Sequence, residues 1–252
     1  MQYGICPLSI VPLRAEPKNA SEQTSQLLYG EFFTILDLQK SWSKIQNESD
    51  GYEGWINNKH FQFIEKSIFQ KLQATKKRYA AELVDFIWKE DDILFPTPIG
   101  SLVSSAQYLG HRFEGKKSVE TKPKSNLVNT ALNYLNSPYM WGGKSPFGID
   151  CSGFVQSVYQ LNGVQLPRDA YLQAEHGETL GFIDESEPGD LAFFDDNEGE
   201  ITHVGIIMPD YQIIHAFGKV RIDRIDQTGI FNISLKKHTH KLRLLKKLIT
   251  KN

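Results

Sequence analysis

The fold is decided by one stretch near the middle of the chain, Asp150-Cys151-Ser152-Gly153-Phe154-Val155-Gln156. Apolar side chains recur at helical spacing from there onward, at Phe154, Val155, Val158 and Leu161, and Asn162-Gly163 is typical of a helix end. The pattern predicts a helix that begins at Cys151. Backbone N–H groups in the first turn of a helix lack partners, and the helix dipole favours an anion there. We therefore expect Cys151 to be an activated cysteine with a lowered thiol pKa.

The segments on either side of this helix predict an α+β domain. Upstream, residues 126–135 carry apolar side chains at helical spacing, which indicates a helix that ends before Pro138. Downstream, residues 191–194, 203–208 and 212–217 are short apolar runs bounded by turn residues, as expected of strands. Helices followed by an antiparallel sheet are the order typical of the α+β class.

The N-terminal half has a different pattern. Residues 5–64 contain short apolar runs separated by turn signals, among them Asp50-Gly51, and this spacing predicts a small β-barrel. Residues 66–72 and 76–84 are compatible with helix or strand, and a polar, turn-rich segment near residue 120 indicates a boundary. We expect a barrel domain over 1–64, a second small β unit or an elaborate linker over 65–120, and the α+β domain over 121–252.

Composition excludes several classes of partner. The chain has 252 residues, and its 28 basic and 30 acidic side chains leave a net charge of −2. No overall field would recruit nucleic acid or an anionic membrane, and the longest apolar runs fall short of the roughly 20 residues of a membrane helix. We predict no nucleic-acid binding and no membrane insertion. The first seven residues lack the pattern of an export signal, so we expect a cytoplasmic protein unless a leader has been removed.

Two histidines are the expected partners of Cys151. His203 opens one predicted strand and His215 lies in the next, so the two can face each other across a hairpin that turns at Pro209-Asp210. One imidazole would take the thiol proton and the other would orient it. A zinc ion held by these three side chains is an alternative, although no C-x-x-C or H-E-x-x-H pattern supports it. We predict no metal and no cofactor.

The remaining candidate groups have simpler interpretations. Cys6 is far from Cys151 in the sequence and is expected to be structural. His238-Thr239-His240 lies among lysines near the C-terminus and could bind a metal or an anion. A solvated surface is the favoured interpretation of that segment.

Six ordered motifs resemble the NlpC family of papain-like cysteine peptidases, which cut bacterial cell-wall peptides. They are Tyr139–Gly143, Asp150–Gln156, Leu166–Ala170, Pro188–Phe194, Thr202–Ile206 and Ile214–Ala216. The resemblance implies a papain-like domain of helices packed on an antiparallel sheet, with Cys151 as nucleophile, His203 as general base and His215 as orienting residue. It also implies cleavage between γ-D-glutamate and a diamino acid of murein peptides. The N-terminal part, with Trp42 and residues 51–56, is similar to the bacterial SH3-like domain often fused to this peptidase.

The same resemblance implies how substrate is selected. Relatives with this architecture and without an export signal look like enzymes that recycle wall peptides with a free N-terminal L-alanine. The positions of Tyr52 and Asp150 match those that accept the substrate ammonium, and Glu31 is a candidate third acceptor. Ser152 belongs to the same substrate-binding group, while Arg168 braces the site or contacts a carboxylate. Alternative functions are a wall-remodelling hydrolase, a catalytically idle wall-binding module, and an amidase or acyltransferase.

Overall fold

The computed structural model describes residues 1–90, 93–118, 121–196 and 198–249, and it divides into two compact units. The first comprises Met1–Glu120 together with Trp141–Pro146, and the second comprises Thr121–Met140 together with Phe147–Asn252. The boundary expected near residue 120 falls beside residues 119–120, which lie outside the described part of the chain. Residues 65–120, expected as a separate β unit or a linker, belong to the first unit.

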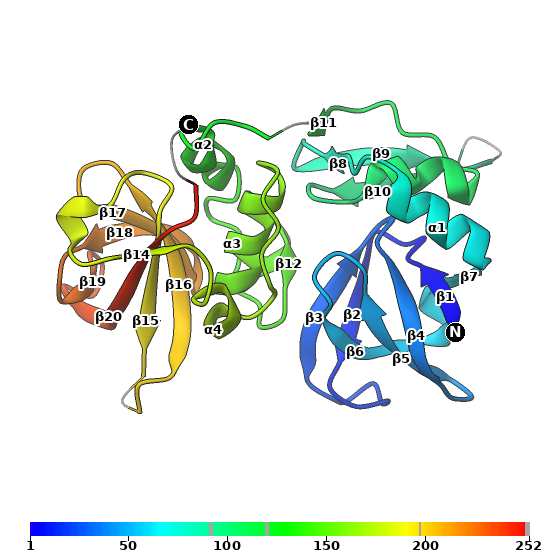
Figure 1. Ribbon diagram of the computed structural model, residues 1–252, viewed down its shortest axis with the longest axis horizontal. Coiled ribbons are helices and arrows are strands. Elements are labelled where there is room, and N and C mark those ends of the chain that lie inside the picture. Colours follow the sequence, from blue (N-terminus) through cyan, green and yellow to red (C-terminus); the bar gives the residue numbers. More distant parts are fainter. Residues whose placement is uncertain (91–92, 119–120, 197, 250–252) are drawn as a thin grey trace. The chain divides into compact units, whose positions relative to one another are not determined.

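The first unit contains a seven-stranded antiparallel sheet in the order β3-β2-β6-β5-β4-β1-β7 (Figure 1). Its strands are β1 (Gln2–Ile5), β2 (Ile10–Arg14), β3 (Gln23–Leu28), β4 (Phe32–Leu38), β5 (Trp42–Asn47), β6 (Glu53–Asn57) and β7 (Gln62–Ile64). Gly51 connects β5 to β6 with a positive φ of 71°, a conformation that suits glycine, as the Asp50-Gly51 turn predicted. The sheet is the SH3-like region that the sequence indicates.

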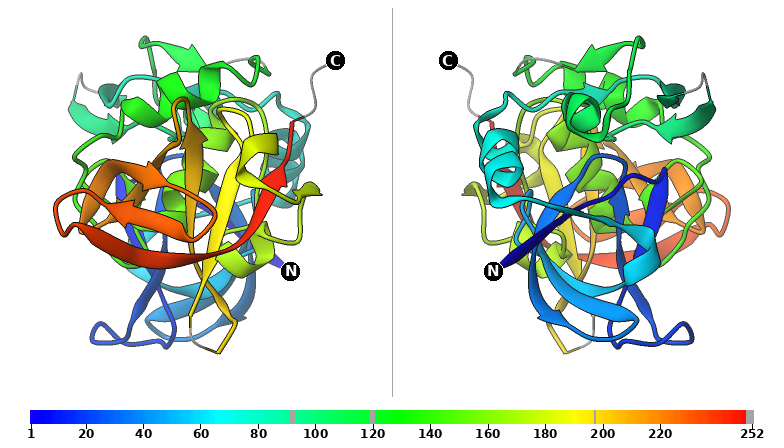
Figure 2. Two further views of the ribbon diagram at one scale, coloured as in Figure 1. Left: turned by 90° about the vertical axis from the view of Figure 1, so that its left-hand side faces the viewer. Right: turned by 90° about the vertical axis from the view of Figure 1, so that its right-hand side faces the viewer.

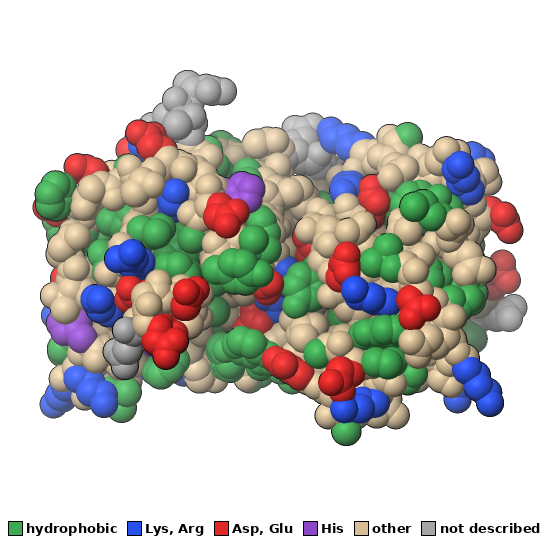
Figure 3. Space-filling view, turned by 60° about the horizontal axis from the view of Figure 1, so that its bottom comes forward, with side chains coloured by type: hydrophobic (Ala, Val, Ile, Leu, Met, Phe, Trp, Pro, Cys, Tyr) green, Lys and Arg blue, Asp and Glu red, His purple; other side chains and the backbone are tan. Residues whose placement is uncertain are grey.

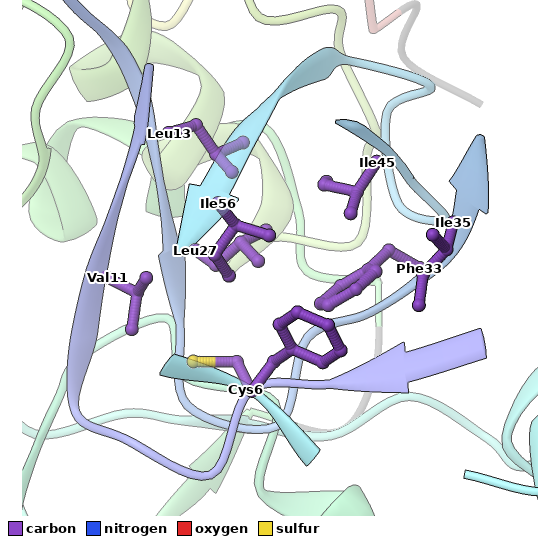
Figure 4. Close-up of a cluster of buried hydrophobic side chains, with 9 residues drawn as sticks. Cys6, Val11, Leu13, Leu27, Phe33, Ile35, Ile45 and Ile56 are labelled. Atoms are coloured by element: carbon purple, nitrogen blue, oxygen red, sulfur yellow. The ribbon is translucent and has the colours of Figure 1, made fainter. Parts of the chain in front are cut away.

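The core of this sheet is aliphatic and aromatic. Val11 and Leu13 alternate along β2 and are both buried, because successive side chains of a strand point to opposite faces. They pack with side chains from β3, β4, β5 and β6 around Phe33, and Cys6 lies in the same cluster (Figure 4). Burial raises the pKa of the Cys6 thiol to about 12. Cys6 is therefore a core residue with an unreactive thiol, as expected from the sequence.

The described residues of the segment 65–120, which was expected to be a β unit or a linker, contain helices as well as short strands. The ambiguous segment 66–72 is helical, because Phe69 and Leu72 are one turn apart and are both buried. Phe69 stacks on Tyr3 of β1 with ring centroids 4.1 Å apart. The elements of this segment are α1 (Lys66–Ala74), β8 (Tyr79–Ala80), β9 (Val84–Trp88), β10 (Leu94–Pro98), β11 (Lys117–Ser118) and the short helix η3 (Val103–Leu109), while the short helix η1 (Asn58–His60) lies before it, between β6 and β7. Strand β12 (Lys144–Ser145) also belongs to the first unit.

The second unit belongs to the α+β class, with helices packed on an antiparallel sheet. Its helices are α2 (Asn126–Leu132), α3 (Cys151–Gln160), α4 (Ala170–Gln173) and the short η4 (Ile183–Glu185). Its strands are β13 (Gly148–Ile149), β14 (Glu178–Leu180), β15 (Leu191–Asp195), β16 (Ile201–Met208), β17 (Gln212–Phe217), β18 (Lys219–Ile225), β19 (Gly229–Asn232) and β20 (Lys237–Lys247). Helices α2, α3 and α4 all contact β16 and cover one face of the sheet (Figure 1).

The sheet of the second unit closes on itself. Its strand order is β14-β20-β15-β16-β17-β18-β19, and the long β20 also pairs with β19. Six strands, β15 to β20, therefore form a closed antiparallel ring, and Figure 2 shows β20 in red curving along it. Closure brings residues from the C-terminal strand next to strands that precede it by more than thirty residues.

The surface agrees with the small net charge. Lys and Arg side chains are interspersed with Asp and Glu over the face seen in Figure 3. Within the described ranges, none of the helices has the length and apolar character needed to cross a membrane.

Candidate active site

Cys151 is the first residue of helix α3. The Asp150 side chain caps this helix by accepting a 2.7 Å hydrogen bond from the Gly153 N–H. All ten residues of α3 are buried, and Cys151 itself is 5% exposed. The helix is thus fixed in the domain core, and the cap aligns its first turn.

The thiol of Cys151 lies against strand β16. Its Sγ is 3.9 Å from the Thr202 carbonyl oxygen and near the Val204 N–H, the backbone groups that flank His203. Burial, followed by the negative charge of Asp150, raises the pKa of this thiol to about 12, while the Val204 N–H and the Arg168 charge act in the opposite direction. The prediction of a lowered thiol pKa was therefore wrong. The helix terminus does favour an anion, but the residue that caps it is itself an anion.

The two predicted histidines meet across the β16–β17 hairpin. Gly205 is the residue opposite His215, and His203 lies two residues before Gly205 on the same face of β16. The His203 Nε2 is 2.8 Å from the His215 Nδ1, a hydrogen-bond distance. A Cβ atom at Gly205 would come within 3.0 Å of the His215 Cβ, so glycine leaves room for this contact.

Both imidazoles are buried, which disfavours their charged forms. His203 is 6% exposed and His215 is fully buried. Burial and the neighbouring histidines hold the pKa of His203 well below its usual value, and burial also lowers the pKa of His215. These directions favour a neutral thiol beside neutral imidazoles in the resting site. The nitrogens that face each other are also occupied by their mutual hydrogen bond, which disfavours the alternative of zinc held jointly by these three side chains.

Sequence reasoning missed a carboxylate behind His215. Asp223 on β18 is fully buried, and its Oδ2 lies 3.2 Å from the His215 Nε2. Arg221 is the cross-strand neighbour of His215, and its Nε lies 2.7 Å from the same carboxylate oxygen. The sequence gives only a weak signal of this ion pair, because Arg221 and Asp223 are simply two charged residues, two positions apart, in the segment that follows His215. Such a pair is typical of a solvated strand face.

His240 was also misjudged from the sequence. It belongs to β20 and is half-buried, and its ring stacks on that of His203 with centroids 4.2 Å apart and an interplanar angle of 25°. Burial lowers the pKa of His240 to about 4. Its neighbour His238 is exposed and paired with Asp226, as the surface interpretation predicted. The favoured interpretation was wrong for His240 because β20 closes the sheet over the histidines.

Three of the predicted substrate-binding residues form one cluster beside Cys151. Arg168, 2% exposed, pairs with both carboxylate oxygens of Asp150 and donates to the Ser152 Oγ at 2.9 Å. The guanidinium thus holds Asp150 and Ser152, the residues on either side of Cys151 in the chain. This geometry supports the bracing role of Arg168, while a contact between Arg168 and a substrate carboxylate remains a prediction.

The other two predicted binding residues, Glu31 and Tyr52, lie in the first unit. Glu31 is 3% exposed, and its Oε1 is 2.9 Å from the Nζ of Lys144, which is 2% exposed. Its second oxygen accepts from the Leu28 N–H at 2.6 Å. Tyr52 is half-buried and packs against the core cluster of the sheet. Glu31 therefore already neutralises one ammonium group within its own unit, and its contact with a substrate stays a prediction.

Comparison with known proteins shows which families this chain resembles. The NlpC/P60 family pattern matches residues 136–241, and the bacterial dipeptidyl-peptidase Sh3 domain pattern matches residues 13–61. A dipeptidyl-peptidase 6 from Lysinibacillus sphaericus is 30% identical in an alignment of 249 residues that covers 85% of this chain and 89% of that protein. A gamma-D-glutamyl-L-lysine dipeptidyl-peptidase from Bacillus cereus is 28% identical over 229 residues, covering 79% of this chain and 68% of that protein.

A solved structure has the same fold. The crystal structure of an NlpC/P60 family protein from Bacillus cereus matches with a TM-score of 0.78 at 18% identity, over 98% of this chain and 100% of that chain. At this level of identity the likeness concerns the fold alone.

Proposed function

This chain belongs to the NlpC/P60 family of cysteine peptidases, and from that premise we propose that it hydrolyses the γ-D-glutamyl–diamino acid bond of murein peptides that carry a free N-terminal L-alanine. The observation that carries the proposal is the contact between His203 and His215 beside a cysteine at a helix start. The names of the relatives, which include a gamma-D-glutamyl-L-lysine dipeptidyl-peptidase, support the choice of bond.

The proposed reaction uses Cys151 as nucleophile and His203 as general base. His203 takes the thiol proton as Sγ attacks the carbonyl carbon, because a raised thiol pKa makes a free thiolate scarce before that step. The resulting imidazolium then protonates the leaving amine of the diamino acid. A water molecule, deprotonated by His203, attacks the thioester, and the proton returns to the departing Sγ. His215 orients His203 throughout.

Substrate selection is proposed to depend on the free amine. Asp150 and Tyr52 would each accept a hydrogen bond from the substrate ammonium, with Glu31 as a third acceptor and Ser152 as a neighbouring contact. An ammonium in a closed site needs such acceptors, since an unpaired charge is strongly unfavourable there. The name dipeptidyl-peptidase denotes an enzyme that removes two residues from a chain end, and this supports recognition of a free end. We place the reaction in cytoplasmic recycling of wall peptides.

The experiment compares L-Ala-γ-D-Glu-diaminopimelate with its N-acetyl form. Acetylation removes the charge that makes these hydrogen bonds strong and adds bulk at the amine, so we expect kcat/KM to fall by roughly 10³-fold or more. Tyr52→Phe should reduce kcat/KM for the free peptide modestly while leaving that for the acetylated peptide unchanged. Equal rates on the two peptides, or cleavage of intact sacculi, would instead favour a wall-remodelling hydrolase.

A further inference from the structure

A fully buried carboxylate contacts His215 on the side away from His203. Asp223 is 0% exposed, and its Oδ2 faces the His215 Nε2 at 3.2 Å. A buried carboxylate must be paired or hydrogen-bonded, because an isolated charge would be expelled or neutralised. The strands supply the alignment: His203, His215 and Asp223 lie on the successive strands β16, β17 and β18.

Among the described residues, the other groups that contact the Asp223 carboxylate are hydrogen-bond donors. Arg221 NH2 donates to the Oδ1 at 3.0 Å, the Ile233 N–H donates to the same oxygen at 3.1 Å, and the Asn232 Nδ2 lies 3.4 Å from the Oδ2. Burial alone would raise the pKa of Asp223, but these hydrogen bonds and that from His215 hold it below its usual value. Asp223 is therefore ionised and can only accept, so His215 must carry its proton on Nε2.

The tautomer of His215 in turn determines the tautomer of His203. With Nε2 protonated, neutral His215 presents the lone pair of Nδ1, and the 2.8 Å contact then requires His203 to donate from its Nε2. Neutral His203 is left with a lone pair on Nδ1. We propose that Asp223 is a positioning residue that, through His215, selects the ring tautomer of His203 in which Nδ1 is the base. This inference rests on the function proposed above.

The proton balance of the step is simple. As Sγ attacks the carbonyl carbon, the S–H bond breaks and an N–H bond forms at His203 Nδ1, which makes an imidazolium with both nitrogens protonated. Asp223 and Arg221 remain as an ion pair, and neither gains nor loses a proton. When the leaving amine departs, Nδ1 gives that proton to its nitrogen. The opposite tautomer of His203 would carry a proton on Nδ1 from the start and could not accept another there.

The wild-type protein offers the most direct test. Nitrogen-15 NMR of protein labelled at histidine distinguishes protonated from unprotonated ring nitrogens. At pH 7.5 we expect His215 protonated on Nε2 alone and His203 protonated on Nε2 alone. A His215 ring protonated on Nδ1 would overturn the inference, whatever the activity of any variant.

Kinetics of Asp223→Asn provide the second test. Donors face both oxygens of Asp223, so in either orientation the Asn amide must direct its NH2 group at one of them. When the NH2 group faces His215, it requires an unprotonated Nε2 on His215, which is the wrong tautomer. In serine peptidases the analogous change lowers kcat about 10⁴-fold. Here one more imidazole intervenes, so we expect kcat to fall roughly 10²-fold with KM little changed.

A matched control is available on the same hairpin. Asp226 also faces a histidine, with its Oδ2 2.9 Å from the His238 Nε2, but both side chains are exposed. Asp226→Asn should retain the wild-type kcat. In a His215→Gln background, where no imidazole transmits the effect, Asp223→Asn should cause a much smaller further loss.

The pH profile separates positioning from a merely structural role. His203 faces His215 and His240, and His215 also faces Asp223 and Arg221. Loss of the negative charge at position 223 disfavours the imidazolium, so the acid limb of kcat/KM should move to lower pH in Asp223→Asn. A loss of activity in Asp223→Asn without this displacement, or a loss equal to that of Asp226→Asn, would overturn the inference. Activity in Cys151→Ala would instead overturn the proposed function.

Discussion

Arg168→Met should destabilise the protein far more than the loss of an ordinary ion pair. Arg168 is 2% exposed, and its NH1 lies 3.0 Å from the Asp150 Oδ1 and 2.9 Å from the Ser152 Oγ, while its NH2 pairs with the Asp150 Oδ2. Removal of the guanidinium leaves the charge of Asp150, itself 5% exposed, without its cation. Breaking a buried pair from one side lowers the free energy of unfolding by about 3–5 kcal/mol.

The control is a salt bridge of the opposite kind. Lys116 and Glu82 lie 3.2 Å apart with side chains 73% and 54% exposed, so Lys116→Met should change the free energy of unfolding by about 0–1 kcal/mol. A double variant, Arg168→Met with Asp150→Asn, should be more stable than Arg168→Met alone, because the uncompensated charge is gone.

Urea denaturation followed by far-ultraviolet circular dichroism measures these differences. Alkylation of Cys151 gives an independent readout, because the Arg168 charge lowers the thiol pKa and its loss should slow alkylation at a fixed pH. The reasoning is refuted if Arg168→Met and Lys116→Met lower stability equally. A double variant less stable than Arg168→Met would also refute it.

Three further predictions follow from the histidines and the thiol. Because the pKa of Cys151 is raised to about 12, its alkylation by iodoacetamide should rise about tenfold per pH unit from about pH 6 to 9; a plateau below pH 7 would reveal a preformed thiolate. His203→Ala should be as inactive as Cys151→Ala, whereas His215→Gln should retain measurable turnover, and equal inactivity of folded His215→Gln would contradict an orienting role. The pKa of His240 is lowered to about 4, so between about pH 6.5 and pH 4 the unfolded chain binds a proton at this residue that the folded protein does not. The free energy of unfolding should therefore decrease as the pH is lowered from about 6.5 to 4. His240→Phe should lessen this fall when the Tm is measured against pH, and an unchanged slope would contradict it.

The elements of the second unit were predictable where local pattern decides structure. The strand expected over 212–217 is β17 as observed, and the helix expected from Cys151 is α3. Apolar runs of that length between turn residues are compatible with few structures other than the predicted ones. The turn between the histidines lies one residue later than the predicted Pro209-Asp210, since Asp210 and Tyr211 adopt the positive φ values of 58° and 54°.

What the sequence did not reveal depends on long-range pairing. Arg221 and Asp223 alternate along a short strand in the manner of a solvated face, yet Asp223 is fully buried. Asn232 and the Ile233 N–H cover Asp223 at the end of β19, and the pairing of β20 with the distant strand β15 closes the sheet and places His240 on His203. No local pattern predicts that pairing, since it joins segments whose spacing carries no periodic signal.

The thiol pKa shows a second limit of sequence reasoning. The start of a helix does favour a thiolate, but the outcome depends on burial and on the sign of the nearest charge. Asp150 was expected both to cap the helix and to bind substrate. The two residues are adjacent in the sequence, but the burial that contributes most to the raised Cys151 pKa becomes evident only in the folded protein.

The central claim, that Cys151 forms a thioester with the γ-D-glutamyl group, is tested most directly by trapping the acyl-enzyme. The protein would be mixed with L-Ala-γ-D-Glu-diaminopimelate, quenched in acid within milliseconds and digested for mass spectrometry. The account predicts an L-Ala-γ-D-glutamyl adduct on the peptide that contains Cys151, and neither adduct nor product with Cys151→Ala. Release of diaminopimelate by Cys151→Ala at the wild-type rate, or an adduct on another residue, would contradict it.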